Sequence, residues 1–301
     1  MKKLTTIISS LLMVASLCVM TSCDDEKDDK KNSKGIKGTE NGYAWVDLGL
    51  PSGLKWATCN VGAANPWDYG DYFAWGETKP KSVYDRSTYK WYKYEGPREY
   101  DYTIIKYNND SKFGIVDNKD VLDLVDDAAS VNMGGRWRMP TLEEQHELIN
   151  NCYWEWTDDY IGKGVAGYII YKVKNMADKG KASLKDYMGN IKVFGLDEEY
   201  EFGHEAEDFS LFDYPKNVLV ASYSLSDTHI FLPTAGTFYR DYHNDGNHLG
   251  YSSVGFYLSA SLDFSISPYC SSGLIFYSDC VWVDFDDEGR GYGRSVRGVC
   301  K

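Results

Sequence analysis

The chain has 301 residues, of which 45 are acidic and 32 are basic, and its formal net charge at pH 7 is −13. A surface this acidic repels phosphate backbones and anionic lipid headgroups, so the composition argues against nucleic acid as a partner. A chain of this length is also long enough to bury a sizeable hydrophobic core.

The N-terminal residues have the pattern of a secretory signal peptide. A basic start precedes an apolar run over 4–20, which is too short to remain as a stable membrane anchor. Small residues then precede Cys23, as at the site where a lipoprotein is cleaved and the new N-terminal cysteine is acylated. We predict a signal peptide over 1–22 and lipidation of Cys23, which would tether the protein to a membrane. An ordinary cleaved signal with an incidental cysteine is the alternative.

A hydrophilic segment follows Cys23. Residues 24–35 contain no apolar side chain, so we predict a lipidated cysteine and disordered acidic linker over 23–41. An acidic cluster in this place is similar to the surface-export signal of lipoproteins in the Bacteroidetes, which predicts a position on the outside of the outer membrane. A plain solvated linker is the alternative. Loss of Lys2 and Lys3 with the signal would leave 30 basic and 45 acidic residues, a net charge of −15.

The residues from 42 to 301 are interpreted as one domain, because no second linker of low complexity interrupts them. The chain has 25 Tyr and 28 Gly, a composition that favours strands separated by turns. Short apolar and aromatic runs at 168–173, 217–221 and 230–232 are the clearest candidate strands.

Two helices are predicted. Thr141 and Glu144 have the spacing of a capping box, in which each side chain accepts from the other residue's backbone N–H, so a helix should begin at Leu142. Apolar residues recur at helical spacing after it. A second, shorter helix is predicted around 126–131.

The cysteine content fits an oxidising compartment. Five cysteines remain after loss of Cys18 and acylation of Cys23: Cys59, Cys152, Cys270, Cys280 and Cys300. The odd number leaves at least one thiol free or paired between chains. Cys270 and Cys280 are disulfide candidates if adjacent strands carry them, and the pairing of Cys59, Cys152 and Cys300 stays open. The spacings do not match those of zinc sites.

Several blocks stand out along the domain: WVDLGLPSGLKWATCNVGA (45–63), YGDYFAWGET (69–78), VDNK (116–119), DDAA (126–129), GGRWRMPT (134–141), FLPTAG (231–236) and YGRSVRGVC (292–300). Together they resemble the Fibrobacter succinogenes major paralogous domain, which occurs in lipoproteins of the Bacteroidetes. They cover most of the domain and follow the family's order. The chain departs from the family at Met133, Gln145 and Leu258, where an aromatic residue is usual, and we interpret these departures as a repacked core.

The resemblance implies an α+β, C-type-lectin-like fold related to formylglycine-generating enzymes, with twisted antiparallel sheets, about two helices, long loops and chain ends that return to one sheet. It also implies a cell-surface protein with no established chemistry. The family's short link before Phe231 is longer here, so we predict an insertion at about 175–227.

Catalysis is not expected. The formylglycine-generating relatives use a reactive cysteine pair with copper and oxygen, and their iron-dependent relatives use three histidines, whereas neither arrangement is recognisable among the cysteines and five histidines of this chain. Phosphate-binding loops and nucleophile elbows are also missing from the sequence. An oxidase of the formylglycine-generating type remains an alternative.

Two oxygen-rich stretches are candidates for Ca²⁺. Asp241, Asn244, Asp245 and Asn247 surround Gly246 but lack the order of an EF-hand loop. The second stretch, 198–208, is strongly acidic. Since a charge run is usually a solvated face, no metal ligand or cofactor is assigned and Ca²⁺ is kept as an alternative.

The C-terminal segment is the predicted ligand face, because the final strands carry it in C-type-lectin-like domains. This segment mixes aromatic and short polar side chains, which is the chemistry of adaptable binding surfaces. Alternation within 281–286 places Trp282, Asp284 and Asp286 on one face, which we expect to be exposed, and the valines on the other. The predicted ligand-binding set is Trp282, Asp284, Asp286, Tyr277, Asp279, Glu288 and Arg290.

These observations lead to one functional hypothesis and one rival. The hypothesis is a surface lipoprotein that binds an extracellular glycan or protein ligand without catalysis. The rival is a component of an adhesin or fimbrial assembly that packs on a partner chain. A concave aromatic and acidic groove would favour a small ligand, and a large exposed apolar patch would favour a permanent partner.

Overall fold

The computed structural model describes residues 37–96, 102–185, 188, 190–196, 220–241, 246–250, 253–265, 267–286 and 289–301. The chain divides into two compact units, Met1–Lys34 and Gly35–Lys301, and all the described residues belong to the second. The signal peptide, Cys23 and the acidic stretch at 198–208 lie outside the described residues and remain predictions.

Within the described residues the chain forms two α-helices, four short 3-10 helices and sixteen strands. The helices are α1 (Ala128–Met133), α2 (Leu142–Asn151), η1 (Arg86–Thr88), η2 (Leu124–Asp126), η3 (Tyr160–Gly162) and η4 (Met176–Asp178). The strands are β1 (Lys37–Glu40), β2 (Tyr43–Val46), β3 (Lys55–Ala57), β4 (Tyr92–Tyr94), β5 (Tyr102–Ile104), β6 (Cys152–Thr157), β7 (Gly167–Lys172), β8 (Lys181–Lys185), β9 (Ile191–Gly195), β10 (His229–Pro233), β11 (Thr237–Asp241), β12 (Gly246–Gly250), β13 (Gly255–Leu258), β14 (Ser271–Phe276), β15 (Val281–Asp286) and β16 (Val299–Cys300).

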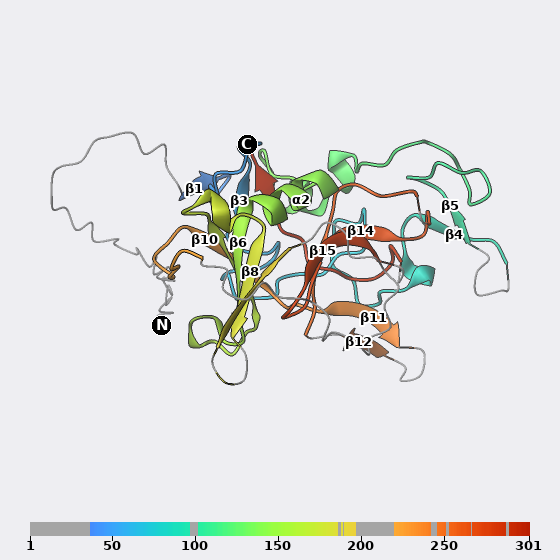
Figure 1. Cartoon of the computed structure of the whole chain (residues 1–301). Coiled ribbons are helices and arrows are strands. Elements are labelled where there is room, and N and C mark those ends of the chain that lie inside the picture. Colours follow the sequence, from blue (N-terminus) through green and yellow to red (C-terminus); the bar gives the residue numbers. More distant parts are fainter. Residues whose placement is uncertain are drawn as a thin grey trace, which may run out of the picture. The chain divides into compact units, whose positions relative to one another are not determined.

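The strands form five sheets, which Figure 1 shows with the helices. The largest has the strand order β10-β7-β6-β8-β9, and the others are β1-β2-β3-β16, β13-β14-β15, β11-β12 and β4-β5. All the strand pairs are antiparallel except β6 with β8. The described part is therefore a mixed α+β domain of mostly antiparallel sheets with two α-helices, as predicted. The strands expected at 168–173 and 230–232 are β7 and β10, whereas Val220 and Ala221 are irregular and the rest of 217–221 is not described.

The N-terminal boundary of the folded domain differs from the prediction. Lys37–Glu40, assigned to the linker, is β1 and pairs with β2. The turn between them is Asn41-Gly42, both at positive φ (46° and 85°), the conformation that an Asn-Gly hairpin turn requires. Glu40 also accepts a hydrogen bond from the Arg136 Nη2 atom at 2.6 Å. The linker prediction 23–41 is thus wrong for residues 37–41, where the Asn-Gly pair is a hairpin signal.

Both predicted helices are present. Thr141 caps α2: its Oγ1 accepts from the Glu144 N–H at 3.3 Å, and the Glu144 carboxylate accepts from the Thr141 N–H at 2.9 Å. Arg138 donates to both Glu144 oxygens, at 2.7 and 2.6 Å. These bonds fix where α2 begins, so that its buried face packs on β14, β15 and β6.

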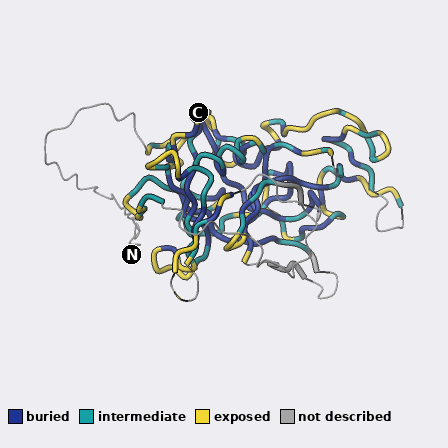
Figure 2. The backbone as a smooth tube through the Cα atoms, viewed as in Figure 1, coloured by how far each residue is buried: buried dark blue, intermediate teal, exposed yellow. Residues whose placement is uncertain are grey.

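Buried side chains form a core on each side of the sheet β13-β14-β15. One cluster includes Trp154, Leu232 and Phe276, and a second includes Trp75, Trp137 and Leu258. Trp137 is 1 % exposed and is therefore a core residue. Met133, Gln145 and Leu258 are all buried. Figure 2 shows buried backbone through the middle of the domain and exposed residues mainly in peripheral turns.

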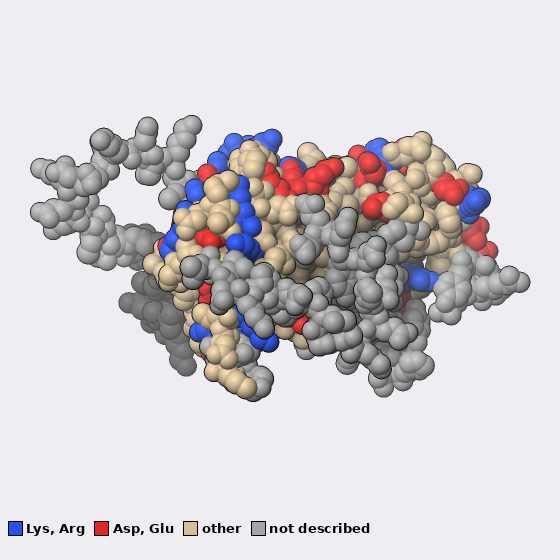
Figure 3. All heavy atoms as spheres, viewed as in Figure 1, with Lys and Arg blue, Asp and Glu red and all other residues tan. Residues whose placement is uncertain are grey.

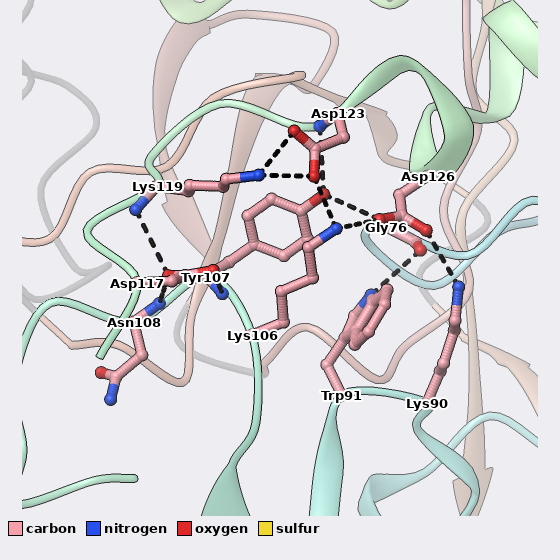
Figure 4. A network of polar contacts seen from close by, with 10 residues as sticks. All are labelled: Gly76, Lys90, Trp91, Lys106, Tyr107, Asn108, Asp117, Lys119, Asp123 and Asp126. Atoms are coloured by element: carbon pink, nitrogen blue, oxygen red, sulfur yellow. Dashed lines mark hydrogen bonds and ion pairs between the residues drawn. The ribbon is translucent and has the colours of Figure 1, made fainter. Parts of the chain in front are cut away.

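A network of ion pairs holds the connection before α1 (Figure 4). The Lys106 ammonium bridges Asp123 and Asp126 at 2.7 and 2.6 Å, and Lys90 and the Tyr107 hydroxyl contact Asp126 at 2.9 Å. The hydrogen bond from Lys106 lowers the pKa of Asp123 to about 2. Burial raises the pKa of Asp126, but the hydrogen bonds from Lys106, Lys90 and Tyr107 lower it by more, so the pKa lies below its ordinary value. Both carboxylates therefore stay ionised.

The predicted insertion adds structure to the largest sheet. It contributes β8, which lies parallel to β6, and β9, which pairs with β8. On the face drawn in Figure 3, acidic side chains gather near α2 and basic side chains near the five-stranded sheet. Through β8 and β9, the predicted insertion extends the five-stranded sheet. The outer face of that sheet carries the groove described next.

Candidate ligand-binding groove

A groove of about 650 Å³ lies on the outer face of the five-stranded sheet. Its floor comes from β6, β7 and β8, and its sides come from the turn 157–161, from Ile191 of β9 and from the segment 220–225. Tyrosine, tryptophan, isoleucine and leucine side chains line it together with three carboxylates and one ammonium group. A concave site that combines aromatic and aliphatic surface with placed polar groups can hold a small ligand.

Alternation along β6 produces this floor. Cys152 and Trp154 point inward and join the first core cluster, whereas Tyr153 points outward and joins a separate cluster with Ile169 and Tyr171 of β7. Because successive side chains of a strand point to opposite faces, Glu155 lies on the same outer face as Tyr153. Both faces of the sheet are thus packed with aromatic residues, and the outer one also carries a carboxylate.

Glu155 lies in the middle of the groove floor, opposite Ile169 of β7 and Ser183 of β8. Its side chain is half-buried, and burial raises the pKa of the Glu155 carboxyl while the nearby Lys185 charge lowers it. Among the described residues, none donates a hydrogen bond to this carboxylate or forms an ion pair with it. The Glu155 carboxylate is therefore available to accept hydrogen bonds from solvent or from a ligand.

One side of the groove is the turn between β6 and β7. The Tyr160 ring stacks on Phe231 with centroids 3.9 Å apart and planes 4° apart, and its hydroxyl lies 3.1 Å from Nε2 of His229. Ile161 has φ = 49°, a left-handed conformation that is rare for a β-branched residue, and its side chain is 44 % exposed. A strained, exposed isoleucine at the rim places apolar surface where a ligand would contact it.

The opposite side is a segment that we call the strap, residues 220–228. Tyr223 of the strap stacks on Tyr153 with centroids 4.5 Å apart and planes 18° apart, and it also contacts Tyr171. Its hydroxyl donates to Oδ2 of the buried Asp178 at 2.7 Å. Burial raises the pKa values of Tyr223 and Tyr171, so both phenols stay protonated at neutral pH.

Lys174, which follows the C-terminal end of β7, holds the strap in place. Its ammonium donates to the Ser222 carbonyl at 2.7 Å and pairs with Asp227 at 2.7 Å. It also lies 5.0 Å from the centre of the Tyr223 ring, within the range of a cation–π contact. The wall of the groove is therefore held by charged as well as aromatic contacts.

The groove combines carboxylate, hydroxyl and ammonium groups with aromatic and aliphatic side chains in its lining. Its described lining contains no cysteine or histidine, so no thiolate–histidine pair lies there. Within the described residues, no group of three or more His, Cys, Asp or Glu side chains is placed to hold a metal ion. Asn244, Asp245 and the stretch 198–208 of the Ca²⁺ candidates lie outside the part of the chain that is described.

The predicted C-terminal ligand face is only partly exposed. Val281 and Val283 pack on the first core cluster and Trp282 packs on the second, which confirms the alternation. The Trp282 side chain is partly buried, so the face that carries it is not fully exposed to solvent. Tyr277 is 38 % exposed and stacks on Trp282 with centroids 5.8 Å apart. Asp279 is exposed, the side chains of Asp284 and Asp286 are not described, and Glu288 lies outside the described residues.

Arg290 does not belong to this face, which corrects the prediction. Its side chain is 1 % exposed and donates from Nε to the Cys270 carbonyl at 3.2 Å and from Nη1 to the Tyr107 carbonyl at 2.8 Å. Its guanidinium also lies 5.2 Å from the centre of the Trp75 ring. Arg290 is therefore a buried residue that ties backbone segments together, and it has no surface to offer a ligand.

The predicted disulfide between Cys270 and Cys280 is also wrong. Among the described residues, no two cysteines are joined by a disulfide. The register pairs Ser271 with Asp286 and Phe276 with Val281, so Cys270 and Cys280 lie at opposite ends of one hairpin. The two are separated by roughly 20 Å along the strands, far beyond the reach of a disulfide.

Sequence reasoning missed the groove because its walls come from segments far apart in the chain. The alternating run from Tyr153 to Trp156 is a local signal for a strand with two packed faces. Neither the parallel pairing of β8 with β6 nor the stacking of Tyr223 on Tyr153 leaves a local signal. An insertion at about 175–227 was predicted from its length. Its contribution to a site was not predicted.

The comparisons with known proteins leave the groove to be interpreted from its own geometry. A search of protein-family models, a search of curated proteins and a search of solved structures each found no match to this chain. Across the described residues, no helix combines the length and the apolar character that crossing a membrane would require.

Proposed function

We propose that the protein is a lipid-anchored protein of the outer membrane surface whose single domain binds an extracellular glycan in the groove, without catalysis. The observation that carries this proposal is the half-buried Glu155 carboxylate, without a described partner, in a groove with aromatic walls. The lipid anchor at Cys23 and the surface location rest on the sequence pattern of the N-terminus.

A glycan suits this groove for two reasons. One face of a pyranose ring is lined by C–H groups and can pack on an aromatic ring, and the half-buried Tyr223 lines the groove. The edge of the sugar carries hydroxyl groups, which can donate to Glu155.

A C-type-lectin-like fold is part of the proposal. It is supported by the return of the chain ends to one sheet, where β16 pairs with β3 in the sheet that begins with β1. Arg138, Pro140 and Thr141 precede α2 as the resemblance implies, and β13, β14 and β15 form the antiparallel sheet before the C-terminus.

A glycan array tests the proposal. The full chain, purified in a detergent that has no sugar headgroup, should bind a discrete set of glycans, and a soluble glycan of that set should compete. Binding to none of the glycans on a broad array would contradict glycan recognition.

An adhesin or fimbrial component is the second candidate, and exposed apolar side chains favour it. Leu124 and Val125 of η2 are 60 and 74 % exposed, and Val131 of α1 is 50 % exposed. Apolar surface of this kind is often covered by a partner chain. If this candidate is correct, the protein extracted from its native membrane should co-purify with a second chain, and Leu124→Asp with Val125→Asp should release it.

A further inference from the structure

We propose that the groove selects a glycan that carries a free, protonated amine, with Glu155 as the ion-pair partner of that amine. This inference rests on the proposed glycan-binding function and specifies the chemistry of its ligand. It follows from which carboxylates in the groove are already engaged and from the charge of the lining.

Of the three groove carboxylates, only Glu155 lacks a described donor. Oδ1 of Asp158 accepts from the indole Nε1 of Trp156 at 2.8 Å, and Oδ1 of Asp159 accepts from the backbone N–H of Gly164. Asp158 and Asp159 are also exposed, at the rim of the groove. Glu155 is half-buried on its floor, so it has less access to water than the other two and gains more from a ligand donor.

The charge of the lining favours a cation. Glu155, Asp158 and Asp159 stand against a single ammonium, that of Lys185. A sugar hydroxyl would satisfy one hydrogen bond of Glu155 and leave its charge uncompensated in the groove. An ammonium group does both, since it donates hydrogen bonds to the carboxylate and its positive charge attracts the negative charge of Glu155.

The strap shows that the aromatic wall tolerates a cation. The Lys174 ammonium already lies 5.0 Å from the centre of the Tyr223 ring on the strap. An ammonium beside Glu155 would lie near the same aromatic wall, since Tyr153 precedes Glu155 by two residues on the same face of β6 and stacks on Tyr223. An N-acetylated sugar would instead bring a neutral acetamide to the same carboxylate.

Two oligosaccharides with the same backbone test the inference. Calorimetric titrations of the full chain in a sugar-free detergent should use the β-1,4-linked tetramer of glucosamine and its fully N-acetylated counterpart near neutral pH. The glucosamine tetramer should bind roughly tenfold more tightly, and its affinity should fall with added salt, as expected for an ion pair. This comparison needs no variant.

Glu155→Gln keeps the shape of the side chain and removes its charge. It should weaken binding of the glucosamine tetramer roughly tenfold and binding of the acetylated tetramer by no more than about threefold, since the amide oxygen still accepts from sugar hydroxyls. Asp120→Asn is the matched control, because it removes an exposed carboxylate that lies outside the groove lining, and it should change either affinity by less than about twofold. Thermal melts of both variants confirm that they are folded.

Failure of this inference can be separated from failure of the proposed function. Equal affinity of the two tetramers, an unchanged affinity in Glu155→Gln, or binding of neutral glycans alone would overturn selection of an amine while glycan binding stands. Binding of a lysine-rich peptide with no binding of any glycan would overturn both.

Discussion

Glu155 illustrates how one side chain links binding and stability. Burial raises the pKa of the Glu155 carboxyl in the folded protein, so the folded state favours the protonated form. Its contribution to stability is therefore greatest below the pKa of the unfolded chain and declines as the pH rises through the folded pKa. A binding site that holds an unpaired carboxylate thus lowers stability at neutral pH.

Glu155→Gln should accordingly raise the free energy of unfolding at neutral pH and have little effect in acid. The control Glu144→Gln should act in the opposite direction. Burial raises the pKa of Glu144, but the Arg138 and Thr141 hydrogen bonds outweigh it and lower that pKa, so its stabilisation is present at neutral pH and lost in acid. Urea melts at both pH values measure these effects, and a loss of stability in Glu155→Gln at neutral pH would show that an unseen group pairs with Glu155.

At the scale of elements, α2 is held by its cap and by the core around it. Thr141→Ala removes the acceptor for the Glu144 N–H and should lower the free energy of unfolding by about 1 kcal/mol. Trp137→Ala should lower it by about 3 kcal/mol or more, because the indole is buried and leaves a cavity. Denaturant melts test the pair, and equal small effects would contradict the burial of Trp137.

The elements also show which structure a sequence can predict. Both α-helices, the capping box at Thr141 and the strands β7 and β10 depend on local patterns and were predicted. The separation of Cys270 from Cys280 depends on the register of β14 with β15, and the burial of Arg290 depends on carbonyls at Cys270 and Tyr107. Such contacts between distant segments have no local signal, so those predictions failed. The turn at Asn41 does have a local signal, which the linker prediction did not use.

The candidate site was partly accessible from the sequence. An aromatic and acidic ligand face was expected, but at the C-terminal strands rather than over β6. The side chains that build the groove come from β6, β7, β8 and the strap, which the chain brings together only through the parallel β6–β8 pair and the Tyr223–Tyr153 stack.

At the scale of the whole molecule, the lipid is the proposed tether. Cys23→Ala should abolish incorporation of a palmitate analogue and should release the protein from membranes, because the predicted mature chain has no other hydrophobic anchor in its sequence. Metabolic labelling followed by fractionation measures both effects. A Cys23→Ala chain that still labels and still sediments with membranes would contradict the lipoprotein interpretation.

The most direct test of the central claim compares two tyrosines that each stack on an aromatic ring. Tyr223 stacks on Tyr153 in the groove, and Tyr277 stacks on Trp282 at the predicted C-terminal face. Affinities of Tyr223→Ala and Tyr277→Ala for a glycan identified on the array should be measured by calorimetry. If the groove is the site, Tyr223→Ala should weaken binding at least about tenfold and Tyr277→Ala by less than about twofold. Loss of binding in Tyr277→Ala with normal binding in Tyr223→Ala would place the site at the C-terminal strands and contradict the groove assignment.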